Sequence, residues 1–200
     1  MTATGAKPEA GGVRGIARRA VRAEIAAKAM ELFLDQGYEE TTVNQIAAAV
    51  GMSGRSLFRY FESKEDLVIG ELIELGSEVA AAFEQRPTDE DPWIALRHAV
   101  QVCVDSLERE EAGLRRATML ANTPSLRTAM LDKQLRWQHM LIPHLEGRLP
   151  APGELAALRA GALVSSALSC LDVAATEWTR TRGDRSLKDL VDIAFAAVRP

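Results

Sequence analysis

The sequence predicts an all-α protein, and three features of its 200 residues support that prediction. Apolar side chains recur at spacings of three and four almost throughout, Ala is abundant, and turn-forming residues punctuate the chain at intervals that suit helices. No segment carries the alternation of apolar and polar residues expected of a strand. We therefore expect about nine helices, one for each periodic segment.

The chain is expected to begin with an arm and a long helix. Residues 1–14 are rich in Gly and Ala and contain Pro8, so they hold too little apolar surface to offset their ordering entropy. We expect a flexible basic arm there. The first helix is predicted from about Ile16 to Gln36, with Gly37 as its C-terminal stop.

Two short helices are expected next, joined by a tight turn. Thr42 is placed to cap the first, which runs through Val50, and Gly51 ends it by tolerating positive φ. Ser53 is placed to cap the second, which is predicted to reach about Phe61. This order matches a helix-turn-helix, whose second helix enters the major groove of DNA.

The rest of the chain is predicted to be helical between short breaks. Ser63 is placed to cap a longer helix that ends before Pro87. Pro143 is expected to interrupt a later helix. The remaining helices are predicted over residues 92–108, 110–121, 124–147, 154–182 and 186–198.

The charge is unevenly distributed along the chain. The formal net charge is −4, yet residues 1–22 carry five Lys and Arg against one Glu, and residues 51–64 carry three against one. What matters to a polyanion is where the charges lie rather than their total. An acidic body with two basic patches can present one face to DNA and repel it elsewhere.

The segment Gly37 to Leu67 carries the strongest motif. It closely resembles the N-terminal DNA-binding domain of the TetR family of transcriptional regulators. The matching residues are the Gly and aromatic after the first helix, Thr41, Thr42, Val43, Ile46, Ala47, Gly51, Ser53, the run 57–61 and the run 63–67. The resemblance implies a DNA-binding domain at 15–66 and a ligand-binding and dimerisation domain at 67–200, after the arm at 1–14.

Helical spacing predicts which residues of the motif can reach DNA. Leu57 and Phe61 are four apart and should face the core, which leaves Arg55 and Arg59 on other faces. Arg55 is our choice for a base-edge contact, because a guanidinium can donate two hydrogen bonds to guanine. A phosphate contact or a solvated surface arginine is the alternative reading for this residue.

The remaining DNA-binding residues follow from the resemblance and the charge. Thr42, Tyr60 and Lys64 match positions that commonly hold phosphates in the family; a cap, helix-end packing and a solvated charge are the alternatives. Phe58 stands where many members have Tyr, so that hydroxyl contact is lost. A basic arm can follow a backbone or enter the minor groove, or merely solubilise the chain. The full predicted set is Arg14, Arg18, Arg19, Thr42, Ser53, Gly54, Arg55, Ser56, Phe58, Arg59, Tyr60 and Lys64.

The C-terminal part offers a candidate effector site. The segments 115–141 and 186–198 look similar to the C-terminal domain of a TetR subgroup associated with acyl-CoA-like ligands. Large apolar side chains there would suit a hydrophobic ligand pocket, although packing in the core alone also explains them. Arg115 and Arg116 suit an anionic group, or are simply helix charges. The candidate ligand residues are Phe83, Trp93, Leu96, Val100, Cys103, Arg115, Arg116, Met119, Trp137, Met140, Leu141 and Trp178.

A homodimer through the last two helices is expected, because two-fold pairing lets two recognition helices read a palindrome. Leu187, Leu190, Val191, Ala194 and Val198 form an apolar stripe on the final helix that could serve this contact.

Several functions lack support in the sequence. Cys103 and Cys170 are too few and too far apart for a disulfide scaffold, the three His show no metal-ligand spacing, and no catalytic or phosphate-binding motif appears. We expect no cofactor, no metal, no membrane span and a cytoplasmic location. The leading hypothesis is a ligand-responsive repressor; the alternatives are a DNA-binding protein of the same fold without an effector, and an all-α enzyme.

Overall fold

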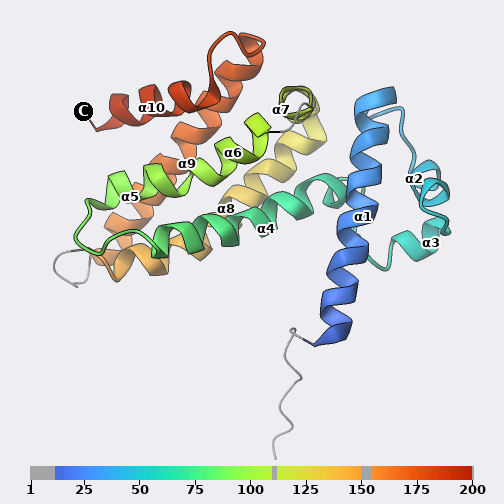
Figure 1. Ribbon diagram of the computed structural model, residues 1–200, viewed down its shortest axis with the longest axis horizontal. Helices are drawn as coiled ribbons and strands as arrows, with labels where there is room; N and C mark the ends of the chain where they lie inside the picture. The colour runs from blue at the N-terminus through green and yellow to red at the C-terminus, as the bar shows by residue number, and fades with distance from the viewer. Residues whose placement is uncertain (1–11, 110–111, 150–154, 200) are drawn as a thin grey trace, which may run out of the picture. The chain divides into compact units, whose positions relative to one another are not determined.

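The computed structural model describes residues 12–109, 112–149 and 155–199, and all their regular segments are helices (Figure 1). No strand occurs within these described ranges, so the prediction of an all-α fold is confirmed. The chain divides into two compact units, Met1–Val68 and Ile69–Pro200, and the boundary falls within one helix, α4 (Asp66–Glu84).

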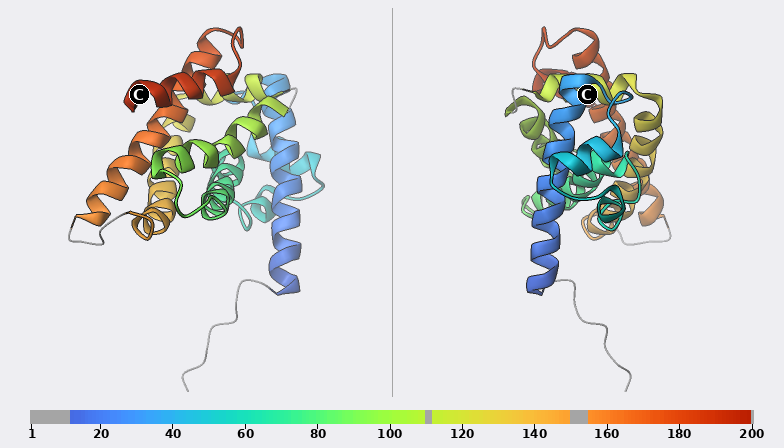
Figure 2. Two further views of the ribbon diagram at one scale, coloured as in Figure 1. Left: turned by 60° about the vertical axis from the view of Figure 1, so that its left-hand side comes forward. Right: turned by 90° about the vertical axis from the view of Figure 1, so that its right-hand side faces the viewer.

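The first unit is built from α1 (Val13–Gln36), α2 (Val43–Ala49) and α3 (Gly54–Leu57), with the two short helices beside the long one (Figure 2). Its core combines an apolar stripe of α1 with two buried side chains from α2 and one from α3. Gly37 ends α1 with φ of +97° and Gly51 follows α2 with φ of +71°, as the sequence predicted. The core residues include Ile25, Ala29, Phe33, Ile46 and Leu57.

The predicted basic arm is wrong in one respect. Helix α1 begins at Val13, before the predicted Ile16, and so Arg14 lies on the helix with Arg18 and Arg19 rather than on an extended arm. Residues 1–11, which make up most of the predicted arm, lie outside the described residues.

The helix after Ser53 is also shorter than predicted. It ends at Leu57 rather than Phe61, and turns held by hydrogen bonds to the third residue back replace its last part. The cause lies in α1, because Arg18 donates to the Arg59 carbonyl at 3.2 Å and Arg22 donates to the Tyr60 carbonyl. These carbonyls therefore have partners without a continuing helix.

The second unit contains the rest of α4 and six further helices. The predicted segment 92–108 is divided at Val100, but its backbone stays helical there (φ −70°, ψ −8°), so the pair corresponds to one predicted helix. The helices are α5 (Pro92–Ala99), α6 (Gln101–Arg109), α7 (Gly113–Asn122), α8 (Pro124–Glu146), α9 (Ala156–Arg180) and α10 (Leu187–Val198).

Helix α8 corrects the prediction for Pro143, which lies inside it rather than interrupting it. The helix continues to Glu146. Pro143 has no amide proton, so the His139 carbonyl, four residues earlier, loses one intrahelical hydrogen bond while the helix continues past it.

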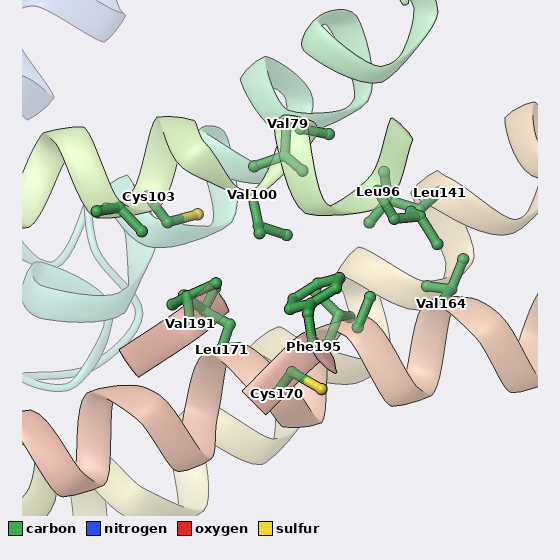
Figure 3. Packing of buried hydrophobic residues seen from close by; sticks show 14 of the residues in the cluster. Val79, Leu96, Val100, Cys103, Leu141, Val164, Cys170, Leu171, Val191 and Phe195 are labelled. Carbon is green, nitrogen blue, oxygen red and sulfur yellow. The ribbon is translucent and has the colours of Figure 1, made fainter. Parts of the chain in front are cut away.

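Side chains from α4, α5, α6, α8, α9 and α10 meet in one apolar core (Figure 3). Trp93 packs on Phe195 with ring centroids 4.6 Å apart, and its indole donates to the Phe195 carbonyl at 3.4 Å. Glu108 accepts a hydrogen bond from the Leu187 amide at 2.6 Å and thereby satisfies the first turn of α10. These contacts attach α5 and α6 to the final helix.

Helix α9 is the one described helix long and apolar enough to cross a membrane by length and composition alone. It packs against α8 and α10, which lie along it (Figure 1). Eight of its side chains are buried in the described part of the unit, including Val164, Leu168 and Trp178. This burial accounts for its apolar composition, because a core helix needs the same residues.

Helices α4 and α8 approach closely at Gly76. The Trp137 indole donates to the Leu72 carbonyl at 3.0 Å, and a Cβ added at Gly76 would lie 2.5 Å from the Trp137 indole nitrogen. The Trp137 ring is fully buried and cannot move aside without disturbing the core. Gly76 is therefore required by this packing rather than by its backbone conformation.

We expect Gly76→Ala to lower the free energy of unfolding by about 1 to 3 kcal/mol, because overpacking outweighs the gain in helix propensity. Gly161→Ala is the matched control: its added Cβ would meet only the Ile142 side chain at 3.8 Å, and it should stabilise the protein by up to ~1 kcal/mol. Urea denaturation measures both. Equal shifts for the two variants would contradict the close approach of α4 and α8.

Candidate nucleic-acid interface

Helix α2 is held by a reciprocal cap. The Thr42 hydroxyl accepts a hydrogen bond from the Gln45 amide at 3.2 Å, and the Gln45 side chain accepts from the Thr42 amide at 2.7 Å. The Thr42 hydroxyl also lies 2.8 Å from the same Gln45 oxygen. The cap predicted for Thr42 is confirmed, and its side chain is exposed at the helix N-terminus.

The turn between α2 and α3 is equally well defined. Ser53 caps α3, with its hydroxyl accepting from the Ser56 amide at 3.2 Å and lying 3.0 Å from the Ser56 hydroxyl. A Cβ at Gly54 would lie 2.6 Å from the Asn44 side-chain oxygen. Gly54 therefore leaves room for the exposed Asn44 side chain of α2, which would have to move for any larger residue at this position.

Helix α3 separates buried from exposed side chains as its spacing predicted. Leu57 and Phe61 are buried, whereas Arg55 and Arg59 are exposed and Ser56 is partly so. Phe58 is 53% exposed, which is high for an aromatic side chain. The unit therefore presents two guanidinium groups and an aromatic ring on a short, capped segment.

Arg22 is a structural residue that sequence reasoning missed. Its guanidinium donates to the Tyr60 carbonyl, lies 3.4 Å from an Asp66 carboxylate oxygen and stacks 4.3 Å from the centroid of the Phe61 ring. Asp66 also accepts from the Glu62 amide at 3.1 Å. The sequence does contain a sign of this role: Arg22 lies three residues before Ile25, and helical spacing therefore places it on the same face of α1 as the buried stripe.

Lys64 also turns toward the interior of its unit. Its ammonium donates to the Tyr38 carbonyl and lies 4.1 Å from the centroid of the Tyr38 ring and 5.7 Å from that of Phe33. The predicted phosphate contact competes with these partners. Tyr60 is partly buried, and its carbonyl is the acceptor for Arg22.

The candidate ligand residues occupy a different part of the chain. Eight of them belong to the apolar core of the second unit, and Met140 packs against it. Met119 is partly buried, Arg115 is exposed and Arg116 is buried, so the two arginines do not share one environment. The eight core members are Phe83, Trp93, Leu96, Val100, Cys103, Trp137, Leu141 and Trp178.

A capped helix-turn-helix with one exposed arginine on its second helix and another just after it, followed in the chain by an all-helical unit, defines a class of DNA-binding transcriptional regulators. The family model for bacterial regulatory proteins of the TetR family matches residues 25–70, so the DNA-binding domain of this chain is of the TetR type. The resemblance drawn from the motif is thereby confirmed.

Three similar proteins illustrate the relationship. The HTH-type transcriptional regulator TcmR of Streptomyces glaucescens is 34% identical over 153 residues, which cover 73% of this chain and 64% of TcmR. FadR of Thermus thermophilus, a TetR family transcriptional repressor solved with lauroyl-CoA, has a TM-score of 0.56 at 24% identity over 88% of this chain and 92% of FadR. NalD of Pseudomonas aeruginosa, the secondary repressor of the MexAB-OprM multidrug efflux pump, has a TM-score of 0.56 at 22% identity over 90% of this chain and 96% of NalD.

The length and identity of these matches limit what can be concluded from them about this chain. This chain spans between 51% and 64% of the length of the curated relatives that it matches. The two solved structures are less than 25% identical to it and therefore establish a shared fold alone. The relatives and structural neighbours are transcriptional regulators rather than enzymes.

Proposed function

We propose that this protein is a homodimeric transcriptional repressor that binds a palindromic operator through α3 and acts in the cytoplasm. One observation carries the proposal: Leu57 anchors α3 in the core, while Arg55 extends into solvent from the same helix and Arg59 from the turn that follows it. A buried anchor with exposed donors is the arrangement that places side chains at base edges and phosphates.

The roles within the interface can be divided by position. Arg55 lies in the first turn of α3, and residues there reach base edges when a recognition helix enters the groove. Arg59 lies beyond the helix end, and we assign it to a phosphate. Arg14, Arg18 and Arg19 on α1 add positive charge for the backbone. Because the Lys64 ammonium is engaged inside the unit, we now assign that residue mainly to positioning.

Dimerisation is supported by the surface of the last two helices. Three residues of the predicted stripe on α10 are not available for an interface, because Leu187, Leu190 and Val191 are buried in the core of the same subunit, whereas Val198 of that stripe is 55% exposed. The adjacent face instead exposes Ile193 at 53%, and α9 exposes Val173 at 62%. We assign the two-fold contact to this face, because large apolar side chains at such exposure favour association.

Release by an effector is the final part of the proposal. The structural neighbour from Thermus thermophilus was solved with lauroyl-CoA, and the second unit of this chain has a core of adaptable apolar side chains. We assign it an apolar or acyl-bearing effector. A 100-fold loss of operator affinity requires about 2.7 kcal/mol of differential binding, and operator DNA must weaken effector binding by the same factor.

The proposed function is tested by selecting an operator from random double-stranded DNA with the wild-type protein. We expect a palindrome with half-sites about 34 to 36 Å apart, one turn of DNA. Adding lauroyl-CoA or a free fatty acid to the complex then tests release. An effector-free regulator of the same fold would enrich the same palindrome but release it with no such compound; enrichment of no sequence would contradict specific DNA binding.

We expect Arg55→Ala to reduce discrimination at one base pair of each half-site by about 1 to 3 kcal/mol, because the variant loses two donors to a base edge. Arg59→Ala is the matched control and should weaken binding to the operator and to random DNA about equally. Fluorescence anisotropy at fixed salt measures both. Equal losses on the two DNAs for the Arg55 variant would remove base readout by this residue.

A further inference from the structure

The second unit holds an ammonium group in a setting unlike that of the other described lysines. Lys133 lies on α8, is partly buried, and places its Nζ 4.0 Å from the centroid of the Trp137 ring. Within the described ranges no hydrogen bond or ion pair reaches this ammonium. The other described lysines each have an oxygen partner: Glu31 for Lys28, the Tyr38 carbonyl for Lys64 and Asp192 for Lys188.

The groups around Lys133 compensate its charge only in part. Desolvation lowers the pKa of Lys133, and Cys103 on α6 and Asp172 on α9 oppose this effect without cancelling it. Burial raises the pKa of Cys103 to about 12, so it is a neutral thiol at pH 7. Glu78 on α4 acts on the same thiol. A desolvated cation of this kind is costly unless an anion pairs with it.

The Trp137 ring, over which the Lys133 ammonium lies, is held in a fixed position. Trp137 is held by its hydrogen bond to the Leu72 carbonyl and by its contact with Gly76, so the ring cannot turn away. Cys103 and Leu141 belong to the same apolar core as Trp137. The surroundings therefore combine one fixed positive charge with apolar and aromatic side chains, which suits a molecule with a single anionic end.

We propose that Lys133 anchors the acidic group of the effector, and that the effector is a monoanionic, largely apolar acid. Its carboxylate pairs with the Lys133 ammonium over Trp137, while its body lies among the apolar side chains of the second unit. This inference rests on the effector binding proposed above and adds its chemical class. Because Trp137 contacts α4, the helix in which the boundary between the two units falls, an anion bound here acts on the helix that continues into the DNA-binding unit.

Calorimetric titration with two pairs of compounds tests the anchor. Decanoate and 1-decanol differ in the acidic group on an acyl chain, and 2-naphthoate and 2-naphthalenemethanol differ in the same way on a planar ring. We expect wild-type protein to bind the acid of at least one pair about 10-fold or more tighter than its alcohol, a difference of about 1.4 kcal/mol. The preferred pair distinguishes a fatty acid from an aromatic one.

Substitution of the lysine identifies the anchor. Lys133→Met should lose the preference for the acid yet still bind the alcohol, whereas Lys133→Arg should keep it. Lys188→Met, an exposed lysine on α10, is the control and should behave as wild type.

The outcomes separate this inference from the proposed function. If Lys133→Met is folded by circular dichroism and keeps the full preference for the acid, the anchor is overturned while effector binding stands. If wild type binds acid and alcohol equally, the chemical class is overturned. If wild type binds none of the four compounds but still selects a palindromic operator, the effector proposal fails together with the anchor, and the DNA-binding function remains.

Discussion

Replacing Val173 and Ile193 together by Glu is expected to convert the proposed dimer into a monomer at micromolar concentration. Each subunit would place two carboxylates in the contact, and the two-fold axis would bring four together. Burying an unpaired charge costs several kcal/mol, and a loss of about 4 kcal/mol already weakens association by roughly 1000-fold. Operator binding should fall in parallel, because one subunit reads only one half-site. Sedimentation velocity measures the change in mass.

A matched control uses the same chemistry on another helix. Leu131 and Leu135 on α8 are 64% and 54% exposed, close to the exposures of Val173 and Ile193, but they lie outside the last two helices. The double substitution Leu131→Glu and Leu135→Glu should leave the protein dimeric and active on the operator. If the Leu131 and Leu135 variant is monomeric while the Val173 and Ile193 variant stays dimeric, the interface lies on α8 instead.

Arg22→Met is expected to destabilise the first unit by about 2 to 3 kcal/mol, since charged hydrogen bonds contribute about 1.5 to 3 kcal/mol and a cation–π contact about 0.5 to 1. The substitution leaves the methylene stem but removes the donors to Tyr60 and Asp66 and the charge over Phe61. The segment after α3 would keep only the Arg18 hydrogen bond to the Arg59 carbonyl as a side-chain attachment to α1. We therefore expect weaker operator binding as well as a lower unfolding temperature by circular dichroism.

Lys28→Met on the same helix provides the comparison for Arg22. Lys28 forms an exposed ion pair with Glu31 at 2.5 Å, and such pairs contribute only about 0 to 1 kcal/mol. Its loss should leave both stability and operator binding almost unchanged. Similar effects for the two variants would mean that Arg22 contributes through general charge rather than through its specific contacts.

Local chemistry explains which predictions from the sequence succeeded. The caps at Thr42 and Ser53 and the positive φ at Gly37 and Gly51 depend on residues within a few positions, so the chain order reveals them. The family assignment succeeded for the same reason, because its motif is a contiguous run. Helical periodicity likewise predicted that Leu57 would be buried.

Predictions failed where a buried side chain could pack in either of two environments, or where its partners lie far away along the chain. The apolar stripe of α10 was correctly seen as buried, but the sequence could not distinguish the core of one subunit from a contact with a second. The length of α3 depended on Arg18 and Arg22, whose carbonyl partners lie 41 and 38 residues away. Local propensity contains no information about such bonds.

The sequence by itself determined the helical class, the helix-turn-helix and the TetR type of the DNA-binding domain of this protein, because each is written in short-range spacing. Only the tertiary structure decided the direction of its long polar side chains. Lys64 and Arg22 turn inward to backbone carbonyls, and Lys133 lies over Trp137. The physical reason is that long, flexible side chains select partners supplied by packing, and packing brings together segments far apart in the chain.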